Sequence, residues 1–204
     1  MKFHEDKYIK VKNFLSPEIC KITERYALYD KYNNFNPDAF QVPGSHVKYA
    51  DPLMESLLMF LKPEMEKHTG LKLIPTYSFF RIYKPGDILE DHTDRPSCEI
   101  SATVTIGFKY VNKSADYRWP IHGHVDGKKC YIPCEVGDAV IYKGCEMKHG
   151  RDYFDVDKGS YQIQVFLHYV NAEGPYKDKY KYDGRKCIGI QQKLNFELPF
   201  SVQT

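Results

Sequence analysis

The sequence lacks any long apolar run and any strong excess of charge of one sign. Its 204 residues contain 29 Lys and Arg against 27 Asp and Glu, which gives a formal net charge of +2. A balance of this kind does not supply the basic surface that a nucleic-acid backbone requires. No stretch approaches the roughly 18 apolar residues of a membrane-spanning helix. The composition therefore predicts a single domain over 1–204 that has neither a nucleic-acid nor a membrane partner.

The sequence also shows no sign of an export signal or of a disulfide framework. Charges break the N-terminal stretch MKFHEDKYIKVKNFL, which has no apolar core of the kind found in secretory signals. We therefore expect a cytoplasmic protein whose six cysteines are free thiols. Cys130 and Cys134 have a spacing that zinc tolerates, but no second pair of ligands completes a site. The nearby His122 and His124 are expected in a turn.

The first third of the chain has the pattern of helices. Ser16 and Pro17 are typical of a helix start, and apolar residues then recur on one face. A second helix is expected from Asp51, with an interruption or kink at Pro63 and an end at Gly70. The segment 31–46 between the two helices is rich in Asn, Pro and Gly, which predicts a long loop.

The pattern changes from helical to β at residue 71. About seven short segments rich in β-branched and aromatic residues follow, separated by turn sequences such as PGD and VGD. This order predicts an α+β fold, in which a sandwich or jelly roll packs against helices. We expect a helical N-terminal part over about 1–70, a jelly-roll core over about 71–170 and a polar C-terminal extension over 171–204.

One short motif points to a metal centre. His92 and Asp94 are two residues apart, so on an extended backbone both side chains project from the same face. His149 follows 57 residues later, after a Gly-Asp turn and a short apolar strand that can return it to the first pair. Two imidazoles and one carboxylate form the facial triad typical of non-haem Fe(II) oxygenases. The competing interpretation of His92 and Asp94 is an exposed polar pair that arose by chance.

Four segments in the same order resemble one family. An aromatic strand and turn lead to the H-x-D motif in 81–94, and a strand and first helix precede them in 8–20. The segments GDAVIYKGCEMKHG and SYQIQVFLHYV follow. Together they resemble the prolyl 4-hydroxylase-like branch of the Fe(II)/2-oxoglutarate-dependent dioxygenases, over most of residues 8–170.

The resemblance implies a fold and a reaction. The fold is a double-stranded β-helix, or jelly roll, with N-terminal supporting helices. Fe(II) is held by His92, Asp94 and His149, with 2-oxoglutarate at two of the open positions and O2 at the third. The reaction is hydroxylation of an unactivated C–H bond with release of succinate and CO2, and ascorbate is a candidate reductant. The substrate is a small molecule or a peptide, such as a prolyl residue or a free amino acid.

The residue that anchors the distal carboxylate of 2-oxoglutarate departs from the family pattern. Relatives carry Lys or Arg about nine or ten residues after the second histidine, which reaches Lys158 here, whereas the strand pattern aligns an uncharged residue. Arg151 is the other candidate, because an extended backbone directs it to the same side as His149. Tyr83 is a candidate donor to the same carboxylate.

Two other functions compete with this interpretation. The first is a cupin-like metal enzyme of the same architecture that does not use 2-oxoglutarate, and the irregular carboxylate anchor keeps it open. The second is a non-enzymatic jelly-roll binding module in which the triad is a coincidence.

Overall fold

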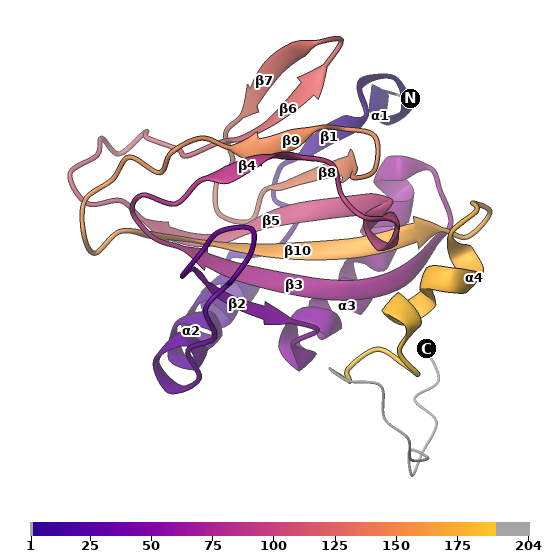
Figure 1. Ribbon diagram of the computed structural model, residues 1–204, viewed down its shortest axis with the longest axis horizontal. Coiled ribbons are helices and arrows are strands. Elements are labelled where there is room, and N and C mark those ends of the chain that lie inside the picture. Colours follow the sequence, from indigo (N-terminus) through magenta and orange to yellow (C-terminus); the bar gives the residue numbers. More distant parts are fainter. Residues whose placement is uncertain (1, 191–204) are drawn as a thin grey trace.

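The computed structural model describes residues 2–190, and two antiparallel sheets dominate it (Figure 1). The larger sheet has six strands in the order β1 (Tyr8–Val11), β8 (Ala139–Lys143), β5 (Ile100–Lys109), β10 (Tyr161–Asn171), β3 (Leu73–Tyr83) and β2 (His46–Tyr49). The smaller sheet has four strands in the order β4 (Leu89–His92), β9 (His149–Arg151), β6 (Ile121–Val125) and β7 (Lys128–Ile132).

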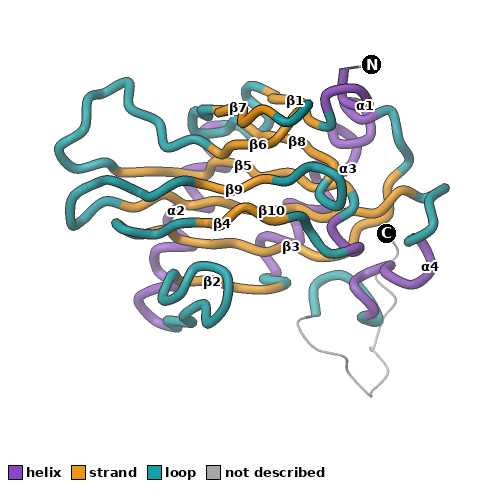
Figure 2. Tube along the Cα trace, turned by 45° about the horizontal axis from the view of Figure 1, so that its top comes forward, coloured by secondary structure: helices purple, strands orange, loops and turns teal. Residues whose placement is uncertain are grey.

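Two long helices cover the face of the six-stranded sheet that is turned away from the four-stranded sheet (Figure 2). The helical segments are α1 (Lys2–Asp6), α2 (Pro17–Asn33), α3 (Pro52–Thr69) and α4 (Lys177–Tyr180), with short 3₁₀ turns η1 (Pro96–Cys98) and η2 (Lys181–Gly184). The described residues thus form a mixed α/β structure with three layers, namely helices, large sheet and small sheet.

The predicted helix starts are confirmed by their caps. The Ser16 hydroxyl accepts a hydrogen bond from the N–H of Ile19, and Asp51 accepts from the N–H of Leu53 at 3.0 Å. Gly70 ends α3 with φ 74°, a left-handed conformation that glycine adopts without a steric penalty. The interruption expected at Pro63 does not occur, because α3 runs through it. The turn beyond Pro63 buries Met65, which favours continuation of the helix despite the missing N–H.

The apolar core is divided between the two spaces that the three layers enclose. The larger cluster joins helix residues such as Leu58 to strand residues such as Phe80 and Val165. Two smaller clusters lie apart from it, one with Tyr83 and Trp119 and the other with Ile121 and Val140. The helices therefore stabilise one face of the large sheet. The other face packs against the small sheet, and polar groups lie between the two sheets.

The structure differs from the sequence-based expectations in three places. Strand β1 lies where the resemblance places a strand, whereas β2 was not predicted and pairs with β3 at the end of the predicted loop. From residue 71 to residue 171 the chain forms eight strands, β3 to β10, where about seven were expected. The C-terminal extension is anchored as far as it is described, because Arg185 forms a buried ion pair with Glu55 at 2.6 Å; residues 191–204 lie outside the described part. No helix in residues 2–190 has the length and apolar character needed to cross a membrane.

Candidate metal centre and binding cavity

The edge of the small sheet brings His92, Asp94 and His149 together. His92 ends β4 and is paired directly with His149, which begins β9. Asp94 follows β4, and its Oδ1 lies 3.5 Å from Nε2 of His92 and 3.7 Å from Nε2 of His149. One possible ligand atom from each of the three residues lies within 4.8 Å of the others. The structure thus unites the three residues that the sequence analysis grouped.

Close backbone packing fixes the position of Asp94. Its N–H donates to the carbonyl of Gly144 at 2.8 Å. A Cβ atom on Gly144 would lie 2.5 Å from Oδ2 of Asp94 and 2.2 Å from the carbonyl oxygen of Cys98. Only glycine fits there, because any side chain would displace the Asp94 carboxylate from the two histidines.

Both histidines of this group are held in the same tautomer. Nδ1 of His92 lies 2.8 Å from the carbonyl of Glu90, and Nδ1 of His149 lies 2.8 Å from the carbonyl of Met147. A carbonyl oxygen only accepts, so each Nδ1 carries a proton, and each Nε2 faces Asp94 as the ring atom left to bind a metal ion. A neutral imidazole in this orientation is the form that binds a metal ion.

Burial and mutual interaction set the charges of the three groups. Burial lowers the pKa of His149, which is therefore neutral at pH 7. Burial acts in the same direction on His92, but the hydrogen bond with Asp94 outweighs it and the net pKa is raised. Burial would raise the pKa of Asp94, yet the hydrogen bond with His92 and the nearby histidines lower it overall. The group therefore presents a carboxylate anion, as divalent-metal binding requires.

A cavity opens directly beside the three residues. Its walls include the aromatic side chains of Tyr77, Phe79 and Phe166 and the polar side chains of Arg81 and His168. Burial lowers the pKa of His168 to about 4, so this histidine adds no positive charge to the cavity at neutral pH. A cavity that combines aromatic walls with several converging polar groups is a suitable place for a small molecule to bind.

Arg81 is a polar residue of this cavity that the sequence analysis did not select. It lies two residues before Tyr83 on β3 and is 2% exposed. Nη2 pairs with Asp38 at 2.5 Å, and Nη1 lies 3.5 Å from the Tyr83 hydroxyl. The period of two along the strand, counted back from Tyr83, is the signal in the sequence that places Arg81 on the same face.

Arg151 is also buried, but no carboxylate accompanies it. It is 2% exposed, and its Nη1 donates to the carbonyl of Trp119 at 2.9 Å. Its Nε has no hydrogen-bond partner among the described residues, and no carboxylate among them lies within the 4.0 Å that defines an ion pair. Tyr83 lies between the two guanidinium groups, with ring centroid distances of 5.5 Å to Arg81 and 5.8 Å to Arg151. None of the three anchors predicted from the sequence, Tyr83, Arg151 and Lys158, lines this cavity, and Lys158 is also exposed in the turn before β10.

Asp94 also has a second set of neighbours. Cys98 and His168 offer atoms within 4.8 Å of it, so this trio is an alternative ligand group. Burial strongly raises the pKa of the Cys98 thiol, which therefore stays protonated and is a poor metal ligand. The group formed with His92 and His149 is consequently the better metal centre.

The expected turn at His122 and His124 is wrong. Both residues lie in β6, and the turn comes one step later at Asp126 and Gly127, where φ is positive. Within the described residues, Cys130 belongs to no group of converging ligand atoms, whereas His122 and His124 converge on Asp91. The sequence analysis did not select Asp91.

Comparison with solved structures assigns the fold. A prolyl-4-hydroxylase from Pseudomonas putida is 14% identical, with a TM-score of 0.64 over 83% of this chain and 95% of its own. The α-ketoglutarate-dependent epimerase SnoN of nogalamycin biosynthesis is 11% identical, with a TM-score of 0.68 over 83% and 78%. HygX from Streptomyces hygroscopicus, solved with nickel and 2-oxoglutarate, is 8% identical, with a TM-score of 0.63 over 84% and 85%.

These structures have the same fold as this chain, but their sequences are only distantly similar to it. No protein-family model matches the sequence, and no curated protein matches it in a sequence search. The chain has the fold of the 2-oxoglutarate/Fe(II) oxygenases, and its resemblance to the prolyl hydroxylases among them is confirmed at the level of structure.

Proposed function

We propose that the chain is an Fe(II)- and 2-oxoglutarate-dependent oxygenase whose metal ligands are His92, Asp94 and His149. The observation that carries the proposal is the convergence of two imidazole Nε2 atoms and one carboxylate beside a cavity. In this proposal the two facing sheets form a double-stranded β-helix, and its open side gives access to the metal.

The residues present fit the metal. Two imidazoles and one carboxylate leave open coordination positions, which is the donor set that suits non-haem iron. When bound, Fe(II) supplies the oxygen chemistry together with 2-oxoglutarate and O2. The chain itself fixes the two histidine tautomers through the carbonyls of Glu90 and Met147. The aromatic walls formed by Phe79 and Phe166 exclude water from the reacting groups.

Arg151 is the proposed anchor for the distal carboxylate of 2-oxoglutarate. A buried guanidinium without a carboxylate is costly, and a dicarboxylate ligand removes that cost. Tyr83 stands beside Arg151 and can donate its hydroxyl to the same group. Arg81 lines the cavity, but Asp38 already neutralises it. Lys158 is less suitable because its turn is exposed.

The proposed reaction is hydroxylation of a C–H bond on a small molecule or a peptide, such as a prolyl residue or a free amino acid. The prolyl hydroxylases among the similar structures support the peptide class, and the epimerase shows that this fold also supports other outcomes. Ascorbate as a reductant and a cytoplasmic location belong to the same proposal.

Release of succinate tests the proposal. Purified protein is incubated with Fe(II), 2-oxoglutarate and O2, and succinate is measured with and without a panel of amino acids and proline-containing peptides. We expect slow release alone and faster release with the substrate, and both are lost in Asp94→Ala. If Mn or Ni binds but 2-oxoglutarate is never consumed, the cupin-like alternative is correct. If no metal depends on Asp94, the chain is a binding module.

A further inference from the structure

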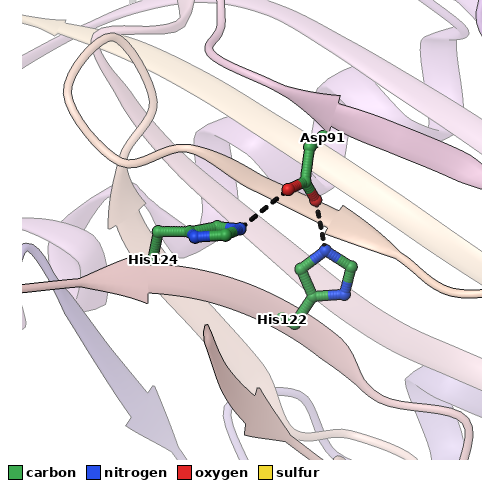
Figure 3. A group of neighbouring side chains, drawn as sticks. All are labelled: Asp91, His122 and His124. Atoms are coloured by element: carbon green, nitrogen blue, oxygen red, sulfur yellow. Dashed lines mark hydrogen bonds and ion pairs between the residues drawn. The ribbon is translucent and has the colours of Figure 1, made fainter. Parts of the chain in front are cut away.

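A second group of two histidines and one aspartate lies on the small sheet (Figure 3). Asp91 projects from β4 toward His122 and His124, which project from β6. Nε2 of His122 lies 2.5 Å from Oδ1 of Asp91, and Nε2 of His124 lies 2.7 Å from Oδ2. We refer to Asp91, His122 and His124 as the outer cluster, and to His92, Asp94 and His149 as the inner triad.

A glycine makes the outer cluster possible. Strand β9 runs between β4 and β6, and its Gly150 is paired with His122. A Cβ atom on Gly150 would lie 3.0 Å from Nε2 of His122, 3.1 Å from Oδ1 of Asp91 and 2.5 Å from the carbonyl of Leu89. Asp91 reaches across β9 because nothing projects from Gly150.

The outer cluster and the inner triad lie on opposite faces of the same strands. Asp91 precedes His92, and Gly150 follows His149, so alternation along each strand directs the two sets to different sides. Between Leu89 and His92 the pairing with β9 shifts by one residue, which places Asp91 opposite the glycine.

A further carboxylate stands behind His122. The His122 side chain is 2% exposed, and its Nδ1 has no hydrogen-bond partner among the described residues. Oδ1 of Asp152 lies 3.4 Å from this atom. Lys129 and the Tyr131 hydroxyl donate to Asp152 at 2.8 and 2.7 Å and hold it in place. A carboxylate at the far nitrogen of an imidazole is the arrangement that orients histidine ligands of zinc.

One positive group lies beside the outer cluster. Nζ of Lys148 lies 3.7 Å from Oδ2 of Asp91, but the lysine side chain is 55% exposed. It can therefore turn into solvent when a cation binds. Both oxygens of the Asp91 carboxylate face the imidazoles, so the carboxylate is directed at the place a cation would occupy.

We propose that the outer cluster is a site for a divalent transition ion of the zinc class, held by Nε2 of His122, Nε2 of His124 and the Asp91 carboxylate. Tetrahedral zinc with bonds of about 2.0–2.1 Å accepts this donor set and takes its fourth ligand from water. The ion replaces the imidazole hydrogens that bridge to Asp91 and ties β4 to β6 across β9. These strands carry His92 and His149, so the ion stiffens the edge of the sheet that holds the inner triad. The proposal does not depend on the reaction of the inner triad.

Zinc stoichiometry in four variants of the full chain tests this site. Zinc content after equilibrium dialysis is compared for Asp94→Ala, Asp94→Ala/His124→Ala, Asp94→Ala/His68→Ala and Asp94→Ala/Asp152→Asn. Asp94→Ala weakens the inner triad, so a remaining equivalent reports the outer cluster. We expect Asp94→Ala to hold one equivalent of zinc and the added His124→Ala to remove it. The zinc affinity should fall by more than ~100-fold, because even the loss of a residue that only hydrogen-bonds to a metal ligand costs about 10–100-fold. His68→Ala on helix α3 is the matched control and leaves the equivalent in place.

Two further readouts keep the result interpretable. Asp152→Asn is expected to weaken zinc by roughly 10–100-fold without removing a ligand. Zinc should raise the melting temperature of Asp94→Ala but not that of Asp94→Ala/His124→Ala, and the metal-free melting curves show whether both variants fold. The proposal is overturned if folded Asp94→Ala takes up no zinc, or if His124→Ala and His68→Ala retain it equally.

Discussion

The inner triad and the outer cluster use the same residue types on the same strands, yet their surroundings differ. In the inner triad, backbone carbonyls hold each Nδ1, and the three ligand atoms face a cavity. In the outer cluster, hydrogen bonds from both imidazoles occupy the carboxylate, and Asp152 and Tyr131 pack behind His122. Open coordination positions beside a cavity suit a reacting metal, whereas three ligands that lie outside that cavity and join two strands suit an ion that holds the strands together. The surroundings, rather than the ligand types, separate the two functions.

The largest expected effect is the loss of succinate release when a residue of the inner triad is substituted, while substitution in the outer cluster preserves it. Asp94→Ala should abolish iron-dependent succinate release, by more than ~1000-fold, because it removes the only anion among the proposed iron ligands. His124→Ala, on the opposite face, should retain release within about tenfold, as expected for a change outside the ligand set. Succinate is measured at saturating Fe(II). Equal losses in the two variants would show that the sites are not functionally distinct.

The anchor of 2-oxoglutarate gives the next effect. Arg151→Ala should raise the KM for 2-oxoglutarate by about 10–150-fold, which corresponds to the ~1.5–3 kcal/mol of a hydrogen bond to a charged group. Lys158→Ala is the matched control and should leave this KM unchanged, because Lys158 is exposed. The reverse pattern would assign the anchor to Lys158. A rise in KM for Arg81→Ala alone would assign it to Arg81.

Gly150 couples the two faces, so its substitution affects both. Gly150→Ala should lower the free energy of unfolding by ~1–3 kcal/mol, because its Cβ meets the backbone of Leu89 at 2.5 Å. Gly123→Ala is the comparison variant on β6. Its Cβ meets only the flexible side chain of Met147, at 2.8 Å, so a smaller loss is expected. Urea unfolding measures both, and a larger loss for Gly123→Ala would contradict the proposed packing.

The last prediction concerns the pH dependence of stability and a buried histidine in the wall of the cavity. Burial lowers the pKa of His168 to about 4, below its value in the unfolded chain. The unfolded state therefore binds more protons between pH 6.5 and about 4, and stability is lost as the pH falls through this window. One such group contributes a slope of up to ~1.4 kcal/mol per pH unit. Chemical denaturation of the metal-free protein across this range should show a shallower slope for His168→Gln, and an unchanged slope would contradict the assignment.

Much of the inner triad was predictable from the sequence. The H-x-D spacing and the later His149 required only strand periodicity and the Gly-Asp turn that begins the returning strand. Arg151 was selected from strand periodicity and Tyr83 from its place in the tyrosine–glycine turn of the family, and the structure buries both. Their roles in binding 2-oxoglutarate stay predictions.

The outer cluster could not be predicted, because it depends on contacts between strands that are not neighbours along the chain. His122 and His124 lie close to turn residues, which favoured a turn, whereas pairing with β7 and β9 makes the segment a strand. The approach of Asp91 depends on a bulge in β4 and on the absence of a side chain at Gly150. Neither feature has a local signal in the sequence.

Anaerobic absorption on addition of Fe(II) and 2-oxoglutarate tests the central claim most directly. The account predicts a visible metal-to-ligand charge-transfer band in the unmodified protein that persists in His124→Ala and disappears in Asp94→Ala. A band that survives in Asp94→Ala, or that never forms in folded unmodified protein, would contradict the assignment of His92, Asp94 and His149 as the site of iron and 2-oxoglutarate.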